Sequence, residues 1–135
     1  MSRARPQPGT AGGVRAMEPT IYHLALTAQW QAAAGAAGGY TGSTLGLSVA
    51  EQGFIHCSFA DQVQSVADLF YLGRGDVLLL TIDPANVGAP IKVEPVGTDS
   101  FPHIYGPLDV AAVRAVRALV PGPDGRLDAA PAPIA

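Results

Sequence analysis

The sequence predicts an α+β fold, in which a small mixed or antiparallel sheet packs against short helices. Helical patterns are short and fall in the first half of the chain, whereas strand-like runs dominate the second half. Strands and helices do not alternate regularly, as a doubly wound parallel sheet requires. The glycines of residues 35–39 also lack the strand and helix that flank a phosphate-binding loop.

The first half of the chain predicts one strand and two short helices. Residues 20–26 are apolar and strand-like. Thr27 suits the N-cap of a helix over 28–34, because its hydroxyl can accept a hydrogen bond from a backbone N–H. A second helix over 47–52 is expected to end at Gly53, since glycine commonly terminates helices.

The next segment predicts a short strand over 54–57 and a third helix. Ser58 and Asp61 are expected to form a variant of the capping box at the start of this helix. Apolar residues then recur with the spacing of one buried helix face. These residues are Val63, Val66, Ala67, Phe70 and Tyr71.

The second half of the chain predicts four extended segments. Residues 77–82 are continuously apolar, which indicates a strand at the centre of the sheet. On the following strand Lys92 and Glu94 share one face, because side chains two residues apart point the same way. The other segments are 91–96, 101–105 and 113–120.

We expect one domain over residues 20–126, because 135 residues suit a single core. Residues 1–19 are expected to be a disordered extension without the apolar region of a secretory signal. Whether residues 1–16 belong to the native protein stays open. The proline-, alanine- and glycine-rich end is expected to fray and to leave 127–135 as a flexible tail.

Composition limits the classes of partner. The net charge of −3 offers no basic face of the kind that binds nucleic acid. No apolar run approaches the ~20 residues of a membrane span. The single cysteine, Cys57, excludes an intramolecular disulfide and fits a reducing, cytoplasmic location. We therefore expect a small-molecule ligand rather than a membrane or a nucleic acid, and the sequence does not predict the oligomeric state.

Three histidines are the main candidates for a functional site in this chain, because only 14% of its residues are charged. His23, His56 and His103 each lie in a short, mostly apolar, strand-like segment. On neighbouring strands they would line one pocket, where imidazole can act as acid, base or hydrogen-bond partner. Two alternatives stay open. The histidines can be separate and half-buried, or they can hold a catalytic zinc ion, although their spacing is not that of a metal motif.

Other polar residues are ambiguous. Ser58 shares a strand face with His56, whereas Cys57 points the other way, so a cysteine nucleophile is not expected. Ser58 lacks a Gly-x-Ser-x-Gly elbow, which favours a helix-capping role. Glu94 is either a functional carboxylate or a surface residue paired with Lys92.

Two tyrosines and one arginine complete the candidates. Tyr22 and Tyr105 lie close to histidines and either stack on a ligand or belong to the core. Arg74, in a glycine-rich turn, either binds a phosphate or is simply solvated.

Several motifs resemble a family of small bacterial proteins that is described as a domain of unknown function. The resemblance spans about residues 20–126. It rests on Ile21-Tyr22-His23-Leu24, Gly53-Phe54-Ile55-His56-Cys57-Ser58, Asp83-Pro84, Glu94-Pro95 and Phe101-Pro102-His103-Ile104-Tyr105-Gly106-Pro107-Leu108. The family is grouped with the ADP-ribosyltransferase-like superfamily, which implies a split α+β fold that binds NAD between two small sheets.

The resemblance implies roles for two residues. His23 would contact the ribose of NAD, as the histidine of the first strand does in many such transferases. Glu94 would stabilise the oxocarbenium-like transition state. Leu24 and Ala25 stand where glycine and threonine usually follow the first histidine, which is a departure from the NAD-binding pattern.

Our leading hypothesis is a histidine-lined pocket that binds NAD or another nucleotide-like or phosphorylated small molecule, with transferase or hydrolase chemistry. His56, His103 and Glu94 would be catalytic, while His23, Tyr22, Ser58 and Tyr105 would bind the ligand. No metal ligands are assigned. The alternatives are a non-catalytic binding or interaction module and a histidine-ligated, metal-dependent hydrolase.

Overall fold

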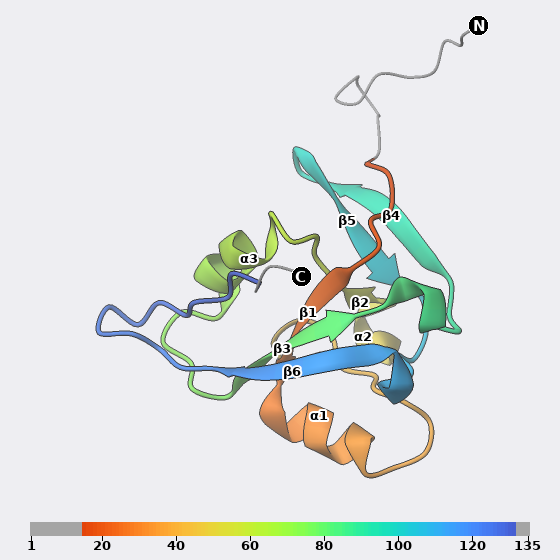
Figure 1. Cartoon of the computed structure of the whole chain (residues 1–135), viewed down its shortest axis with the longest axis horizontal. Helices are drawn as coiled ribbons and strands as arrows, with labels where there is room; N and C mark the ends of the chain where they lie inside the picture. The colour runs from red at the N-terminus through yellow and green to blue at the C-terminus, as the bar shows by residue number, and fades with distance from the viewer. Residues whose placement is uncertain (1–14, 132–135) are drawn as a thin grey trace, which may run out of the picture.

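The computed structural model describes residues 15–131, which form two three-stranded sheets with short helices around them (Figure 1). The strands are β1 (Ile21–Leu26), β2 (Ile55–His56), β3 (Val77–Ile82), β4 (Ile91–Val96), β5 (Asp99–Ile104) and β6 (Val113–Leu119). The α-helices are α1 (Thr27–Ala34), α2 (Val49–Gln52) and α3 (Val63–Phe70), and the 3-10 helices are η1 (Thr44–Gly46), η2 (Pro84–Asn86) and η3 (Val110–Ala112). Neighbouring strands of both sheets are antiparallel, so the predicted α+β class is confirmed.

In the first sheet β3 lies between β1 and β6. All of its residues are buried except the half-buried Thr81, as expected for a strand covered on both faces. The register places His23 of β1 opposite Leu80 of β3. The prediction of a central strand over residues 77–82 is therefore confirmed, and it supplies the middle of the core.

In the second sheet β5 lies between β2 and β4. The β4–β5 hairpin turns at Gly97, whose φ of 62° is a left-handed conformation that glycine adopts at little cost. The register sets His56 opposite His103, and Glu94 opposite Phe101. The second sheet therefore brings together residues that are far apart in the sequence.

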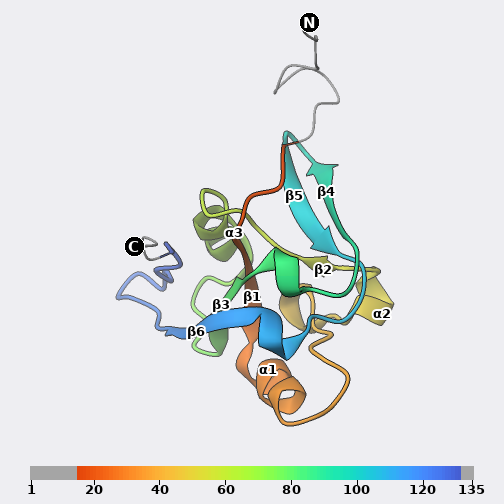
Figure 2. The ribbon, with the colours of Figure 1, turned by 45° about the vertical axis from the view of Figure 1, so that its right-hand side comes forward.

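The two sheets are joined through the backbone of two residues. Tyr22 N donates to Ser58 O over 2.8 Å, and Ser58 N donates to Tyr22 O over 2.7 Å. The β4–β5 hairpin extends beyond the first sheet, and α3 stands to one side of it in both views (Figures 1 and 2). Fully buried aliphatic side chains from both sheets share one core: Ile21, Ile55, Leu80, Ile82 and Ile104.

The start of α3 differs from the expectation. Ser58 is held in the backbone bridge with Tyr22, so the helix begins later, at Val63, and the predicted capping box is wrong. The side chain of Gln62, the residue before the helix, accepts the Phe59 N–H at Oε1 over 2.9 Å and makes no capping hydrogen bond to α3. The Gln62 amide also donates to the Ser100 carbonyl over 2.7 Å, which ties the start of the helix to β5.

The buried face of α3 is largely as predicted. Val63, Val66, Ala67 and the following Tyr71 are buried, but Phe70 is 43% exposed. The 3.6-residue period places Phe70 at the margin of the apolar face, where it meets a cleft rather than the core.

The predicted start of α1 is wrong, whereas the predicted end of α2 is confirmed. Thr27 is the first residue of α1 rather than its cap, because its N–H continues the strand contacts by donating to Asp76 O over 2.9 Å. The helix α2 ends as predicted at Gly53, with φ of 99°. Its capping box, formed by Ser48 and Glu51, was not predicted.

The end of the described chain packs against α3. Leu127 and Ala129 are buried against α3. Gln64 of α3 donates to Leu127 O and accepts from Ala129 N, each over 2.8 Å. Residues 127–131 of the predicted tail thus contact the fold, residues 132–135 lie outside the described part of the chain, and the flexibility of the tail stays a prediction.

The N-terminal segment contacts the fold through Arg15. Arg15 forms an ion pair with Glu18 over 2.7 Å, and its guanidinium lies 4.3 Å from the Phe59 ring centroid. These contacts tie Arg15 to the fold, residues 1–14 lie outside the description, and the disorder of the extension over residues 1–19 stays a prediction. Among residues 15–131, no helix is long and apolar enough to cross a membrane.

Candidate active site

A carboxylate and two imidazoles form a continuous chain of hydrogen bonds across the second sheet. Glu94 Oε1 lies 2.8 Å from Nδ1 of His103, and Nε2 of His103 lies 3.2 Å from Nδ1 of His56. The Tyr105 hydroxyl also donates to Glu94 Oε1. These residues come from β4, from β5 and the residue after it, and from β2. The predicted catalytic set His56, His103 and Glu94 therefore lies together.

The antiparallel register explains why these side chains meet. His103 lies directly between His56 and Lys92 in the sheet, and Glu94 is two residues from Lys92 on the same face of β4. Glu94 thus reaches His103 diagonally. Lys92 does not form the predicted ion pair with Glu94, because its ammonium lies over the Tyr105 ring, 4.8 Å from the centroid.

The hydrogen bonds along the series Glu94, His103 and His56 bear on which ring nitrogens carry protons. The hydrogen bonds from Tyr105 and His103 hold the pKa of Glu94 below its usual value, so the carboxylate is ionised at neutral pH. An ionised carboxylate only accepts, so Nδ1 of His103 must donate to Glu94. Nε2 of His103 then faces Nδ1 of His56, and a His103 ring with a single proton accepts there from the Nδ1–H of His56. In that tautomer Nε2 of His56 carries the free lone pair.

The side chain of His56 lines a cleft. Nε2 of His56 has no hydrogen-bond partner among residues 15–131. In that same part of the chain, Gln29 Oε1 is the one fully buried side-chain nitrogen or oxygen atom without a partner. Nε2 of His56 is therefore accessible, and the residue lines a cleft of about 610 Å³. Burial and the nearby His103 and His23 lower the pKa of His56 to about 4, so it is neutral at neutral pH.

Aromatic side chains hold the two imidazoles in place. Phe54 stacks on His103 with ring centroids 4.0 Å apart and planes 14° from parallel. Phe101 lies against His56 at 4.9 Å. Sequence reasoning assigned neither phenylalanine to the site, although each is two residues from a candidate histidine on the same strand face, which is a usable signal.

The cleft lies between the second sheet and α3. It is close in size to small-molecule sites, which occupy roughly 300–1,000 Å³. Most of its lining is apolar, and its one carboxylate is Asp99 at the hairpin turn. The lining residues are Thr44, Leu47, Gln52, Phe54, His56, Ser65, Val66, Leu69, Phe70, Val96, Gly97, Thr98, Asp99, Phe101 and His103.

His23 does not share the environment of His56. Its Nδ1 lies 2.7 Å from His56 O, and its Nε2 lies 2.8 Å from the Tyr40 hydroxyl. Burial lowers the pKa of His23 to about 4, so the neutral ring donates to the carbonyl and accepts from the hydroxyl. Both nitrogens are engaged within the protein, which favours a structural role over the predicted contact with a ligand ribose.

The remaining candidates lie around the site rather than in the cleft. Tyr22 and Ser58 are buried where the two sheets join, so their ligand-binding roles stay predictions. Tyr105 holds Glu94 through its hydroxyl. Cys57 is buried, which raises the pKa of its thiol and agrees with the expectation that it is no nucleophile. Arg74 pairs with Asp76 over 2.8 Å.

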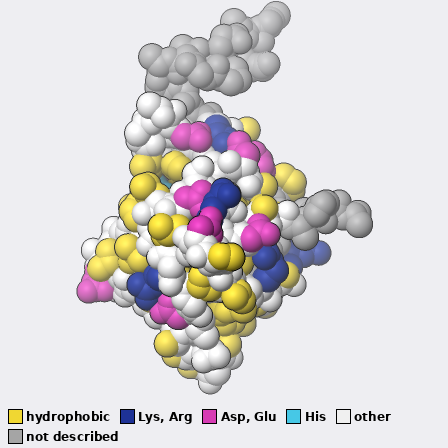
Figure 3. Space-filling view, turned by 90° about the vertical axis from the view of Figure 1, so that its left-hand side faces the viewer, with side chains coloured by type: hydrophobic (Ala, Val, Ile, Leu, Met, Phe, Trp, Pro, Cys, Tyr) yellow, Lys and Arg dark blue, Asp and Glu magenta, His cyan; other side chains and the backbone are white. Residues whose placement is uncertain are grey.

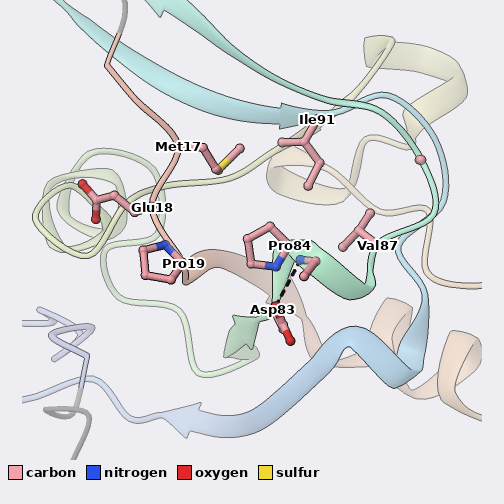
Figure 4. A pocket seen from close by; sticks show the side chains of 9 residues that line it. Met17, Glu18, Pro19, Asp83, Pro84, Val87 and Ile91 are labelled. Atoms are coloured by element: carbon pink, nitrogen blue, oxygen red, sulfur yellow. Dashed lines mark hydrogen bonds between the residues drawn. The ribbon is translucent and has the colours of Figure 1, made fainter.

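Metal ligation and a second hollow in the surface are the other two features that bear on the choice of site. In the described part of the chain, no group of three or more His, Cys, Asp or Glu side chains is arranged to hold a metal ion. A larger hollow of about 770 Å³ lies between the segment around Met17 and η2 (Figure 4). It is lined mainly by proline and aliphatic side chains, and its carboxylates are Glu18 and Asp83. It therefore lacks the acid–base groups of the cleft.

The fold and the site define a small α+β protein with a His–His–carboxylate chain whose two histidines line an apolar cleft. The sequence matches the family described as "Protein of unknown function (DUF952)" over residues 24–116, and the chain belongs to this family. The predicted family resemblance is confirmed at this level.

Solved structures of one bacterial protein resemble the chain closely. The crystal structure of protein CC0527 from Caulobacter crescentus has a TM-score of 0.71 and 32% sequence identity, and the match covers 81% of this chain and 93% of that one. The solution NMR structure of CC0527 gives a TM-score of 0.67 at 30% identity, with coverage of 82% and 93%. A search of curated proteins finds no match for this sequence.

Proposed function

We propose that this protein is an enzyme in which His56 acts as a general base on a small molecule bound in the cleft, with hydrolysis or group transfer as the reaction class. One observation carries the proposal. His56 lines the cleft with no partner for Nε2 among the described residues, while its Nδ1 contacts Nε2 of His103, which is paired with Glu94. A base of this kind needs a fixed tautomer and an open lone pair, and His56 combines both.

The chain of hydrogen bonds has a chemical consequence. When Nε2 of His56 takes a proton from water or from a substrate hydroxyl, positive charge develops on the ring. His103 lies against Nδ1 of that ring and is itself bonded to the ionised Glu94, so the hydrogen bonds hold the ring in the orientation that presents Nε2. His103 and Glu94 thus act as positioning residues, and Tyr105 fixes Glu94.

The ADP-ribosyltransferase-like fold and an NAD ligand are predictions from the sequence resemblance. Two small antiparallel sheets fit the split arrangement that the resemblance implies. The described lining of the cleft, however, contains no lysine or arginine to pair with a diphosphate. We therefore place NAD second to an uncharged ligand. A non-catalytic module is the remaining alternative.

Hydrolysis of an activated ester tests the proposal directly. We expect p-nitrophenyl acetate to be hydrolysed with saturation kinetics. His56→Ala should lower kcat/KM by about 10²- to 10⁴-fold, the usual contribution of a general base. Glu94→Gln should cause a smaller loss, because it weakens only the orientation of His103. Val116→Ala, on the exposed face of β6, is the control.

A thermal-shift comparison separates the alternatives. A ligand that binds only the folded state raises stability by about 2.7 kcal/mol at a hundredfold excess over its Kd. A large shift with NAD or ADP-ribose that depends on His23 would favour the transferase-like alternative. Ester hydrolysis that is unchanged in a folded His56→Ala protein would exclude His56 as the base.

A further inference from the structure

The cleft continues from the two histidines as a groove along β5. Its lining runs from His103 to Asp99 at the hairpin turn, four residues along one strand. At about 3.3 Å per residue, this part of the groove is roughly 13 Å long. That length accommodates an extended chain of roughly eight to ten carbon atoms. The helix α3 forms the opposite wall.

Apolar side chains that are exposed to solvent concentrate on this groove. Nine large hydrophobic residues are exposed in the described part of the chain, and four of them line the groove: Leu47, Leu69, Phe70 and Val96. Leu69 is 74% exposed, which is unusual for a leucine beside a buried helix face. Figure 3 views the side on which α3 lies, and hydrophobic groups appear there between charged ones.

The two walls are of different origin but similar chemistry. Leu69 and Phe70 come from the outer margin of α3, and Val96 and Phe101 come from the hairpin. A ligand between these walls would remove apolar surface on both sides from water. Each fully buried methylene group of such a ligand contributes roughly a factor of four to binding.

The charge of the groove excludes anionic ligands. The described lining holds no lysine or arginine, and its carboxylate is Asp99. Arg15 lies 3.8 Å from Asp99, but its guanidinium is already bonded to Glu18 and Asp61. A phosphate or a free carboxylate would therefore meet negative potential at the outer end of the groove.

From these observations we propose that the substrate is an uncharged carbonyl compound with a linear apolar tail, such as an acyl ester, whose tail lies in the groove between α3 and β5. This inference rests on the proposed function, because it places the reactive carbonyl at His56. Water attacks the carbonyl carbon and loses its proton to Nε2 of His56. The bond from carbon to the leaving oxygen then breaks, and His56 returns the proton to that oxygen.

The test measures kcat/KM for p-nitrophenyl acetate, butyrate and octanoate. We expect kcat/KM to rise with chain length, with octanoate at least about tenfold better than acetate. Six fully buried methylene groups would raise kcat/KM far more than tenfold. We expect the smaller increase because the groove is open and leaves part of the tail exposed to water. Leu69→Ser and Val96→Ser should each lower the ratio of octanoate to acetate by about threefold or more, close to the loss of one buried methylene.

Matched control variants are available. Val116 on β6 is 44% exposed, as is Val96, and Leu72 is an exposed leucine outside the groove like Leu69 within it. Val116→Ser and Leu72→Ser should leave the chain-length ratio unchanged. Equal effects of groove and control variants would overturn the assignment of the groove.

A non-reactive probe separates this inference from the proposed function. Octanamide should stabilise the wild-type protein in a thermal-shift measurement more than acetamide does, and Leu69→Ser should reduce the difference. If acetate hydrolysis depends on His56 but no chain-length preference exists, the substrate class is wrong and the proposed function stands. If octanamide binds in the groove but hydrolysis is independent of His56, the apolar ligand is supported and the catalytic role is overturned.

Discussion

His23 and His56 are joined by one hydrogen bond, and burial lowers the pKa of both to about 4, yet they occupy different situations. Both nitrogens of His23 are bonded within the core. His56 is anchored at Nδ1 alone and leaves Nε2 at the cleft. Two neutral imidazoles with similar acidity can therefore serve different purposes, because accessibility of the second nitrogen decides whether a histidine can act on a ligand.

The two sheets differ in the same way. The first sheet is centred on the apolar strand β3, and its histidine is locked into the core. The second sheet carries Glu94, His103 and His56 and projects a hairpin beyond the core. This contrast indicates that the first sheet supplies most of the core, and the proposed function places the chemistry on the second.

The largest expected effect is the difference in unfolding free energy lost when a residue is truncated in the first sheet or in the second. Leu80 is fully buried in β3, so Leu80→Ala should lower the free energy of unfolding by about 2–5 kcal/mol. Val96→Ala at the exposed end of the hairpin should change it by less than about 0.5 kcal/mol. Urea unfolding followed by circular dichroism measures both. Similar losses in the two variants would remove the distinction between a stabilising and a presenting sheet.

The next effect is acid destabilisation through the two histidines. Their pKa values are about 4 in the folded protein and about 6.5 in the unfolded chain. Between these values the unfolded chain binds more protons, so stability falls as the pH falls from about 6.5 toward 4. For the fully buried His23 the loss is on the order of 3 kcal/mol.

Unfolding measured at pH 7 and at pH 4.5 checks this expectation. His23→Gln removes the titrating group while keeping a polar side chain. The wild-type protein should therefore lose more stability on acidification than this variant does. Equal slopes in the two proteins would contradict the assignment of a neutral, buried His23.

The smallest expected effect compares the histidines directly. His23→Ala leaves the Tyr40 hydroxyl and the His56 carbonyl without their buried partner, which should cost about 1–3 kcal/mol of stability. His56→Ala should cost less, because the cleft admits water to replace its hydrogen bonds. The two variants should have opposite ranking in ester hydrolysis. A larger stability loss in His56→Ala would reverse the proposed division of roles.

Much of the fold follows from local patterns in the sequence. Residues 77–82 are apolar without interruption, and burial on both faces explains this pattern. Residues 91–96 alternate in character, as a half-covered strand of the hairpin does. Gly53 ends α2 because its left-handed conformation suits glycine. Each of these signals acts within a few residues of the chain.

The errors of prediction arise where distant contacts override local preference. Ser58 has good capping chemistry, but the bridge to Tyr22 keeps it extended, and α3 begins only at Val63 without a side-chain cap. The proline- and alanine-rich C-terminal segment suggests fraying. It is nevertheless held by Gln64, about sixty residues earlier. Such partners have no signature in the neighbouring sequence.

The candidate site follows the same division. Composition and short periods in the sequence were enough to predict the α+β class, the strand at the centre of the core, and His56, His103 and Glu94 as the proposed site residues. Only the tertiary structure decided that His56, His103 and Glu94 meet and that His23 is enclosed. Register and packing between strands set these outcomes. A shift of one residue between β2 and β5 would turn the imidazoles to opposite faces of the sheet.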